Sequence, residues 1–94
     1  MGPLERSVER AFIRRCKKCK IWQFKLGLYA LPDRVALMSP ARIEFVEFKR
    51  PGETPRKNQV HTIRRLRRLG FTVHVIDNSK DAIALVNMWT EEEA

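Results

Sequence analysis

Apolar residues near the N-terminus recur at spacings of three and four positions, which places them along one face of a helix. The pattern predicts a helix over Leu4–Lys20. Pro3 suits its first turn, because a proline there loses no helical hydrogen bond. The buried face of this helix would consist of Val8, Ala11, Phe12, Cys16 and Cys19.

The apolar period changes to two after this helix. Residues Ile21–Leu26 alternate, with the aromatic side chains of Trp22 and Phe24 on one side, as expected for a half-buried strand. Val35–Met38 and Ile43–Lys49 are two further strand-like segments. The four residues between them, Ser-Pro-Ala-Arg, are few enough to close an antiparallel hairpin. The first half of the chain therefore predicts one helix and three strands.

A helix-start signal opens the second half of the chain. Thr54 is suited to the N-cap and Pro55 to the first turn, and the apolar face that follows ends at Gly70, which supplies a C-terminal stop. The apolar face of this second helix consists of Val60, Ile63, Leu66 and Leu69.

Phe71–Ile76 is predicted to be a fourth strand and Ser79–Trp89 a final helix, which leaves Glu91–Ala94 as a frayed tail. A strand, helix and strand of this length imply a right-handed crossover, so the third and fourth strands should be parallel. The predicted fold class is α/β, with an α-β-β-β-α-β-α order and a mixed sheet flanked by helices. The 94 residues suffice for one hydrophobic core, so we expect a single domain over residues 1–94.

The chain is strongly basic, with 19 lysine and arginine residues against 11 acidic residues and a net charge of +8. This balance favours a polyanionic partner, and nucleic acid is the leading candidate. The apolar stretches are only a few residues long and the N-terminus lacks an apolar signal region, so we expect neither a membrane partner nor secretion. The protein should remain inside the cell.

Cys16 and Cys19 form a single C-x2-C pair, without the second Cys or His pair that a zinc site needs. His61 and His74 stand alone in the sequence. Because both cysteines fall on the predicted first helix, burial as small apolar residues is the better interpretation. We expect neither a disulfide nor a structural zinc.

The candidate chemistry lies around Asp33, Glu47 and Lys49. Side chains at i and i+2 of a strand share a face, so Glu47 and Lys49 project together, and the hairpin returns Asp33 to their side. Two carboxylates, with the carbonyl of Phe48, are the oxygen ligands that Mg2+ takes in proteins, and Mn2+ should be able to substitute. A metal there would activate water and neutralise phosphate charge, while Lys49 stabilises the transition state. This is the chemistry of phosphodiester hydrolysis.

Two helical positions place further polar residues near this site. Glu9 lies at the edge of the buried face of the first helix, where a third carboxylate could reach the metal through water. Glu5, one turn earlier, is the weaker alternative. Gln59 lies early in the second helix, where its amide can hold Lys49 or a phosphate.

The ordered set of these motifs closely resembles the VRR-NUC domain of the PD-(D/E)XK nuclease superfamily, from about Glu5 to Ile76. The resemblance identifies the chain as a stand-alone version of that domain. The matching segments are Ser7-Val8-Glu9-Arg10, Pro32-Asp33-Arg34, the run from Phe45 to Gly52, Gln59, and Leu69-Gly70.

By this resemblance, Asp33, Glu47 and Lys49 match the catalytic triplet of the superfamily. Glu9 matches its helix-one acid and Gln59 the glutamine that follows the triplet. Lys25 matches a frequent basic position before the Pro-Asp. Many relatives carry a glycine just before Pro-Asp and another in the hairpin turn, and this chain lacks both. These differences concern loop shape and leave the chemistry intact.

Stand-alone members of the family are similar to the archaeal Holliday-junction resolvases. This similarity implies that a homodimer cuts branched double-stranded DNA, in the cytoplasm or nucleoid of a bacterial or phage-infected cell. A monomeric flap or nicking nuclease and a non-catalytic basic DNA-binding module are the alternatives. Because so small a domain has little room for large side chains, we expect the dimer interface to bury Trp22, Leu28, Tyr29 and Trp89.

Basic residues that flank the catalytic strand are the better candidates for DNA contacts, namely Lys25, Arg50, Arg56 and Lys57. Glu44 faces away from Glu47 and is expected to be solvated. The basic residues of the two predicted helices are as consistent with solubility as with phosphate contacts. They are Arg14, Arg15, Lys17, Lys18 and Lys20 in the first helix, and Arg64, Arg65, Arg67 and Arg68 in the second.

Overall fold

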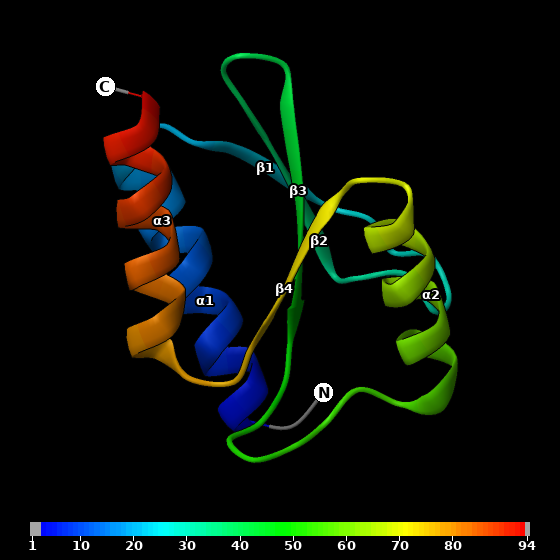
Figure 1. Cartoon of the computed structure of the whole chain (residues 1–94). Coiled ribbons are helices and arrows are strands. Elements are labelled where there is room, and N and C mark those ends of the chain that lie inside the picture. The colour runs from blue at the N-terminus through cyan, green and yellow to red at the C-terminus, as the bar shows by residue number, and fades with distance from the viewer. Residues whose placement is uncertain (1–2, 94) are drawn as a thin grey trace.

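Helices cover both faces of a four-stranded sheet in the computed structural model, which describes residues 3–93 (Figure 1). The predicted α/β class and element order are confirmed. In chain order the elements are α1 (Pro3–Cys19), β1 (Trp22–Lys25), β2 (Arg34–Met38), β3 (Arg42–Phe48), α2 (Lys57–Arg68), β4 (Thr72–Ile76) and α3 (Ser79–Glu93).

The strands lie in the order β1-β2-β3-β4. β2 is antiparallel to β1 and β3, and β4 is parallel to β3, as the predicted hairpin and crossover require. Arg34 pairs with Val46, so the register places Asp33, the residue before β2, beside Glu47. The carboxylates therefore meet because the hairpin register brings them together.

One face of the sheet packs against α1 and α3, which lie side by side (Figure 1). Three fully buried aromatic side chains form the centre of this core. The ring of Phe12 lies 5.2 Å from that of Phe48 and 5.9 Å from that of Trp89. Trp89 is 0% exposed, so the prediction that it contributes to a dimer interface is wrong. The interior holds Trp89 because this side chain of α3 packs against Phe12 of α1 and against His74 of the sheet.

The other face of the sheet is covered by α2, and β1 lies outside that cover. The alternation predicted for β1 is present, but Trp22 is 68% exposed and Phe24 is also exposed. Gln23 lies on the opposite, half-buried side, where its side-chain oxygen accepts a hydrogen bond from Arg34. The half-buried side of β1 is therefore the polar side, because α1 covers that face of the sheet and α2 does not extend to β1.

The structure differs from the sequence prediction at the start of α2, on the buried face of α2 and at the end of α3. α2 begins at Lys57 rather than at Thr54, and Leu69, predicted to lie on its buried face, is exposed. The stop at Gly70 is confirmed by its positive φ of 100°. α3 continues to Glu93, so the predicted frayed tail is wrong up to that residue, and Ala94 lies outside the described residues.

Cys16 is buried and both cysteines are free thiols. Burial raises the pKa of Cys16 to about 12, which keeps its thiol protonated at neutral pH. Within residues 3–93, none of the helices is long and apolar enough to cross a membrane.

Candidate active site

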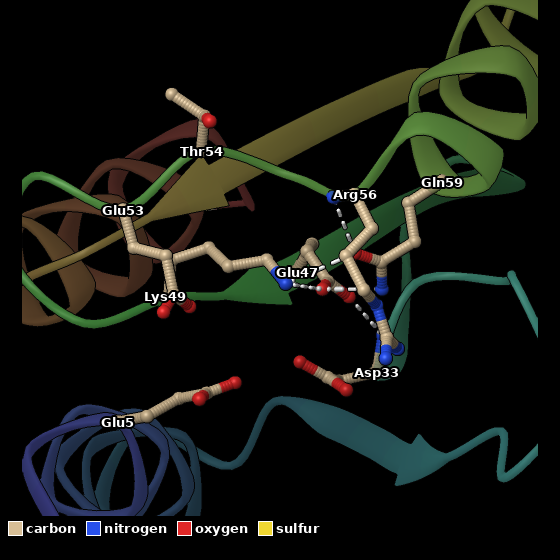
Figure 2. A pocket seen from close by; sticks show the side chains of 8 residues that line it. All are labelled: Glu5, Asp33, Glu47, Lys49, Glu53, Thr54, Arg56 and Gln59. Atoms are coloured by element: carbon tan, nitrogen blue, oxygen red, sulfur yellow. Dashed lines mark hydrogen bonds and ion pairs between the residues drawn. The ribbon is translucent and has the colours of Figure 1, made fainter. Parts of the chain in front are cut away.

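An open pocket of about 470 Å³ lies between the end of β3, the start of α2 and the first turn of α1 (Figure 2). Four of the five side chains predicted for the site line the pocket together: Asp33, Glu47, Lys49 and, from α2, Gln59. The complete lining is Glu5, Asp33, Glu47, Lys49, Glu53, Thr54, Arg56 and Gln59.

Backbone hydrogen bonds hold Asp33 and Glu47 side by side. The backbone N–H of Asp33 donates to Oε1 of Glu47 at 3.1 Å, and the backbone N–H of Phe48 donates to Oδ2 of Asp33 at 2.9 Å. Each acidic residue is thus fixed by the strand that carries the other. This reciprocal arrangement keeps two carboxylates adjacent although their charges repel each other.

Gln59 connects Lys49 to Glu47. Nζ of Lys49 donates to Oε1 of Gln59 at 2.9 Å, while Nε2 of Gln59 donates to Oε2 of Glu47 at 2.7 Å. Lys49 also forms an ion pair with Glu47 at 3.1 Å. The same Gln59 oxygen accepts the backbone N–H of Arg56 at 3.2 Å, so the first turn of α2 fixes the amide in place. Gln59 therefore orients the ammonium and the carboxylate together.

The pKa of Glu47 is raised to about 7. Burial of the carboxyl is the main cause and the negative charge of Asp33 is the second; Lys49 and Gln59 act in the opposite direction. A perturbed carboxyl that shares a pocket with a second acid and a lysine is typical of functional sites, which makes this pocket the candidate.

Comparisons with known proteins agree with this geometry. The chain is 34% identical over 77 residues to the "Putative nuclease p44" of Acyrthosiphon pisum secondary endosymbiont phage 1, covering 79% of this chain and 83% of the relative. A solved structure described as a VRR_NUC domain superposes with a TM-score of 0.80 at 24% identity, covering 94% of this chain and 99% of the other. The chain belongs to the VRR-NUC nuclease family. No family model matches it.

Two acids of α1 were candidates for the VRR-NUC site, and only Glu5 lines the pocket. Glu9 does not line the pocket; its Oε2 atom forms an ion pair with Nε of Arg34 at 2.8 Å. Glu5 lines the pocket instead, and Figure 2 shows it extending from α1 towards Asp33. The two residues are one helical turn apart, so only the position of α1 along its axis distinguishes them.

The other predicted ligands and contacts of the VRR-NUC site are less closely grouped. The backbone N–H of Phe48 donates to Asp33. Because the N–H and the carbonyl of an extended residue lie on the same edge of the strand, the carbonyl of Phe48, a predicted metal ligand, is on the edge that faces Asp33. Residues 3–93 contain no cluster of three or more His, Cys, Asp or Glu side chains arranged to hold a metal ion.

Of the predicted DNA contacts, Lys25, Arg50, Arg56 and Lys57 are all exposed, and only Arg56 lines the pocket.

Glu44 was predicted to be solvated, and this prediction is wrong. It is 7% exposed, and its Oε1 atom lies 2.6 Å from Nε2 of His74 and 3.0 Å from Nε1 of Trp89. Arg42 adds an ion pair at 3.3 Å. Glu44 shares the face of β3 with Val46 and Phe48, which was the sequence signal that this face is covered.

Proposed function

We propose that the protein is a Mg2+-dependent, structure-specific DNA endonuclease that cuts four-way (Holliday) junctions as a homodimer, with Mn2+ able to substitute. The observation that carries the catalytic part is the pairing of Asp33 and Glu47 in a pocket that also holds Lys49. Membership of the VRR-NUC family supports hydrolysis of a phosphodiester bond as the reaction.

A divalent cation fits this pair of carboxylates. The charge of Asp33 helps to raise the pKa of Glu47, and a cation between the two would offset that repulsion. Mg2+ needs only one or two protein carboxylates because water and substrate phosphate complete its six positions. Asp33 and Glu47 would hold the ion, with the carbonyl of Phe48 on the same edge, and Glu5 would act through water. When bound, the ion would activate water and neutralise charge on the phosphate.

The chain's own cations would then act on the phosphate. Nζ of Lys49 donates a hydrogen bond of 2.9 Å to Oε1 of Gln59, so the ammonium is already oriented before DNA binds. An oriented cation stabilises charge that develops on the phosphate in the transition state and needs no rearrangement at that moment. Figure 2 shows Arg56 in the same pocket, where its guanidinium would bind a neighbouring phosphate oxygen.

The choice of a junction as substrate and of a dimer rests on surface and symmetry. Leu28 is 64% exposed, Tyr29 85% and Trp22 68%, and a second copy would cover these apolar side chains. Trp89, buried within the monomer, is not part of this surface. A four-way junction has near two-fold symmetry, which a two-fold dimer with two sites matches.

Cleavage assays test the substrate. End-labelled four-way junction, 5′ flap, nicked duplex and plain duplex would be incubated with the protein, with and without Mg2+. We expect symmetric incision of the junction only when Mg2+ is present. Efficient flap or nick cleavage with an intact junction would favour the alternative substrates, and binding without any cleavage would favour the non-catalytic DNA-binding module.

Light scattering at micromolar concentration tests the dimer. A mass twice that of the 11.1 kDa chain is expected. A mass near that of one chain would exclude the symmetric resolvase mechanism, and a monomeric flap or nicking nuclease with the same catalytic residues would replace it.

A further inference from the structure

The outward surface of α2 carries positive charges that no acidic residue of the helix offsets. The helix contains Lys57, Arg64, Arg65, Arg67 and Arg68 but no acidic residue, and the nearest acids along the chain are Glu53 and Asp77. None of the ion pairs among residues 3–93 involves a residue of α2. Of the five cations, Arg67 donates to the backbone carbonyl of Val73 at 2.6 Å.

Four exposed residues of α2 form one continuous ridge, which we call the α2 ridge: Lys57, His61, Arg64 and Arg68. Their spacings of four, three and four place them along a single helical line. At 1.5 Å per residue, the eleven steps from Lys57 to Arg68 span about 16 Å. This is the axial length of about five base pairs of duplex DNA.

The α2 ridge begins at the active-site pocket. Arg56, the residue before α2, lines the pocket, and Gln59 in the first turn holds Lys49 and Glu47. Figure 2 shows α2 leading away from these residues. Lys57, the first residue of the ridge, directly follows Arg56, so a duplex that extends from the pocket in the direction of α2 would pass the ridge.

Two features of the charge placement are unfavourable for the isolated helix, although Arg65, Arg67 and Arg68 in the last turn interact favourably with the negative end of its dipole. Lys57 lies in the first turn, where the positive end of the helix dipole disfavours cations, and no acid is present there. Arg64 and Arg68, at i and i+4, repel each other. Solubility alone does not require an all-basic helix, because a mixture of acidic and basic residues serves it equally well. Helix α1 has such a mixture, with Glu5 and Glu9 among its basic residues. A bound polyanion would reverse both unfavourable terms.

We infer that the α2 ridge binds the phosphate backbone of one duplex arm of the DNA substrate, over about five base pairs beyond the cleaved phosphate. The inference rests on the proposed function for the identity of the polyanion. It adds the path that the arm takes over the protein and a minimum arm length for full affinity.

The test compares two double variants that change the net charge equally. Arg64→Glu/Arg68→Glu alters the α2 ridge. Arg14→Glu/Lys18→Glu alters a basic cleft between α1 and α3, which lie on the opposite face of the sheet from α2. Fluorescence anisotropy would measure Kd, over a range of salt concentrations, for junctions with arms of about 4 and about 15 base pairs, lengths that bracket the span of the ridge. Arg64→Gln/Arg68→Gln provides a ridge variant without new negative charge.

The parent protein should bind the long-armed junction at least about tenfold more tightly than the short-armed one, because only long arms reach Arg68. The ridge variants should lose this difference and lower the salt slope by about two, whereas the α1 variant should retain the difference. The inference would be overturned if the ridge variants kept the full arm-length effect, or if the α1 variant lost as much of it as they do. Either result leaves the proposed function standing as long as the parent protein cleaves DNA. Absence of DNA binding and cleavage in the parent would instead reject the proposed function.

Discussion

Two buried glutamates lie three residues apart on β3 and differ in almost everything except burial. Glu44 faces α3 and is satisfied by His74, Trp89 and Arg42. Glu47 faces α2, lines an open pocket and has Asp33 as its neighbour. Both carboxylates have donors and a cation beside them, but only Glu47 is also placed against another acid.

This difference separates a structural acid from a reactive one. A buried carboxylate with enough donors connects elements, and Glu44 connects β3 to β4 and α3. A buried carboxylate beside a second acid is held in a state that a cation, a proton or a substrate would relieve, and the raised pKa of Glu47 expresses this. Burial alone therefore does not identify function; the charge and hydrogen-bonding character of the neighbours does.

The largest expected effect is on the chemical step. Lys49→Ala should lower the cleavage rate by at least about a hundredfold, because it removes the oriented cation beside Glu47. Junction affinity should change little, since one of many cations is lost. Single-turnover cleavage and anisotropy on the same DNA check both statements. Lys49→Met keeps the buried stem as a control for folding, and a rate equal to that of the parent would remove Lys49 from the mechanism.

Metal affinity should separate the two glutamates next. Glu47→Gln and Asp33→Asn should each weaken Mg2+ binding by at least about tenfold, because an amide is a poorer ligand for a hard cation than a carboxylate. Glu44→Gln, the matched change on the other face of β3, should leave Mg2+ binding intact. Calorimetric titration of the three proteins measures this. Equal Mg2+ affinity in all of them would place the metal elsewhere.

Stability should respond in the opposite order. Glu44→Gln should lower the free energy of unfolding by about 2 kcal/mol, because it removes the buried charge that pairs with Arg42 and weakens the hydrogen bonds to His74 and Trp89. Glu47→Gln should leave the free energy unchanged or raise it at pH 8 without metal, since it removes a repelled, desolvated charge. Urea denaturation gives both values. A larger loss of unfolding free energy in Glu47→Gln than in Glu44→Gln would contradict the assignment of Glu44 as the structural carboxylate of the pair.

The pH dependence of stability should carry a signature of Glu47. Its folded-state pKa, about 7, lies above the unfolded value of 4.5, so the folded state binds the extra proton between these values. Stability of the metal-free protein from this group should therefore fall as pH rises from 4.5 to 7, by at least about 1 kcal/mol. Denaturation curves across this range should show the slope in the parent and in Glu44→Gln. The slope should be absent in Glu47→Gln, and its persistence there would assign it to another group.

The smallest effects should distinguish the acids of α1. Glu5→Gln should lower the cleavage rate by about threefold to tenfold, because its carboxylate would act on the metal only through water. Glu9→Gln should act mainly on stability, by about 1 kcal/mol, through the loss of its charge beside Arg34. Rates at saturating Mg2+ and melting curves of both variants measure this. A rate defect confined to Glu9→Gln would restore Glu9 as the catalytic acid.

The sequence predicted the elements well because their signals are local. The period-two alternation over Ile43–Lys49 placed Glu47 and Lys49 on one face, and Gly70 marked the end of α2. The start of α2 was misplaced because Thr54 and Pro55 form a plausible cap. The structure instead uses Gln59, whose amide caps the backbone of Arg56 and also orients Lys49. Its contact with Lys49 was predicted from its place early in the helix, whereas its cap on Arg56 was missed because Thr54 and Pro55 gave the stronger start signal.

The amino-acid sequence by itself determined the fold class, the strand faces and the grouping of Asp33, Glu47, Lys49 and Gln59, because alternation and ordered motifs depend on spacing along the chain. Only the tertiary structure decided which faces are covered. It buried Glu44 of β3 and Trp89 of α3 against each other, left Trp22 exposed beyond α2, and brought Glu5 rather than Glu9 to the pocket. These outcomes depend on where each helix lies on the sheet, and that position is set by packing between residues far apart in sequence.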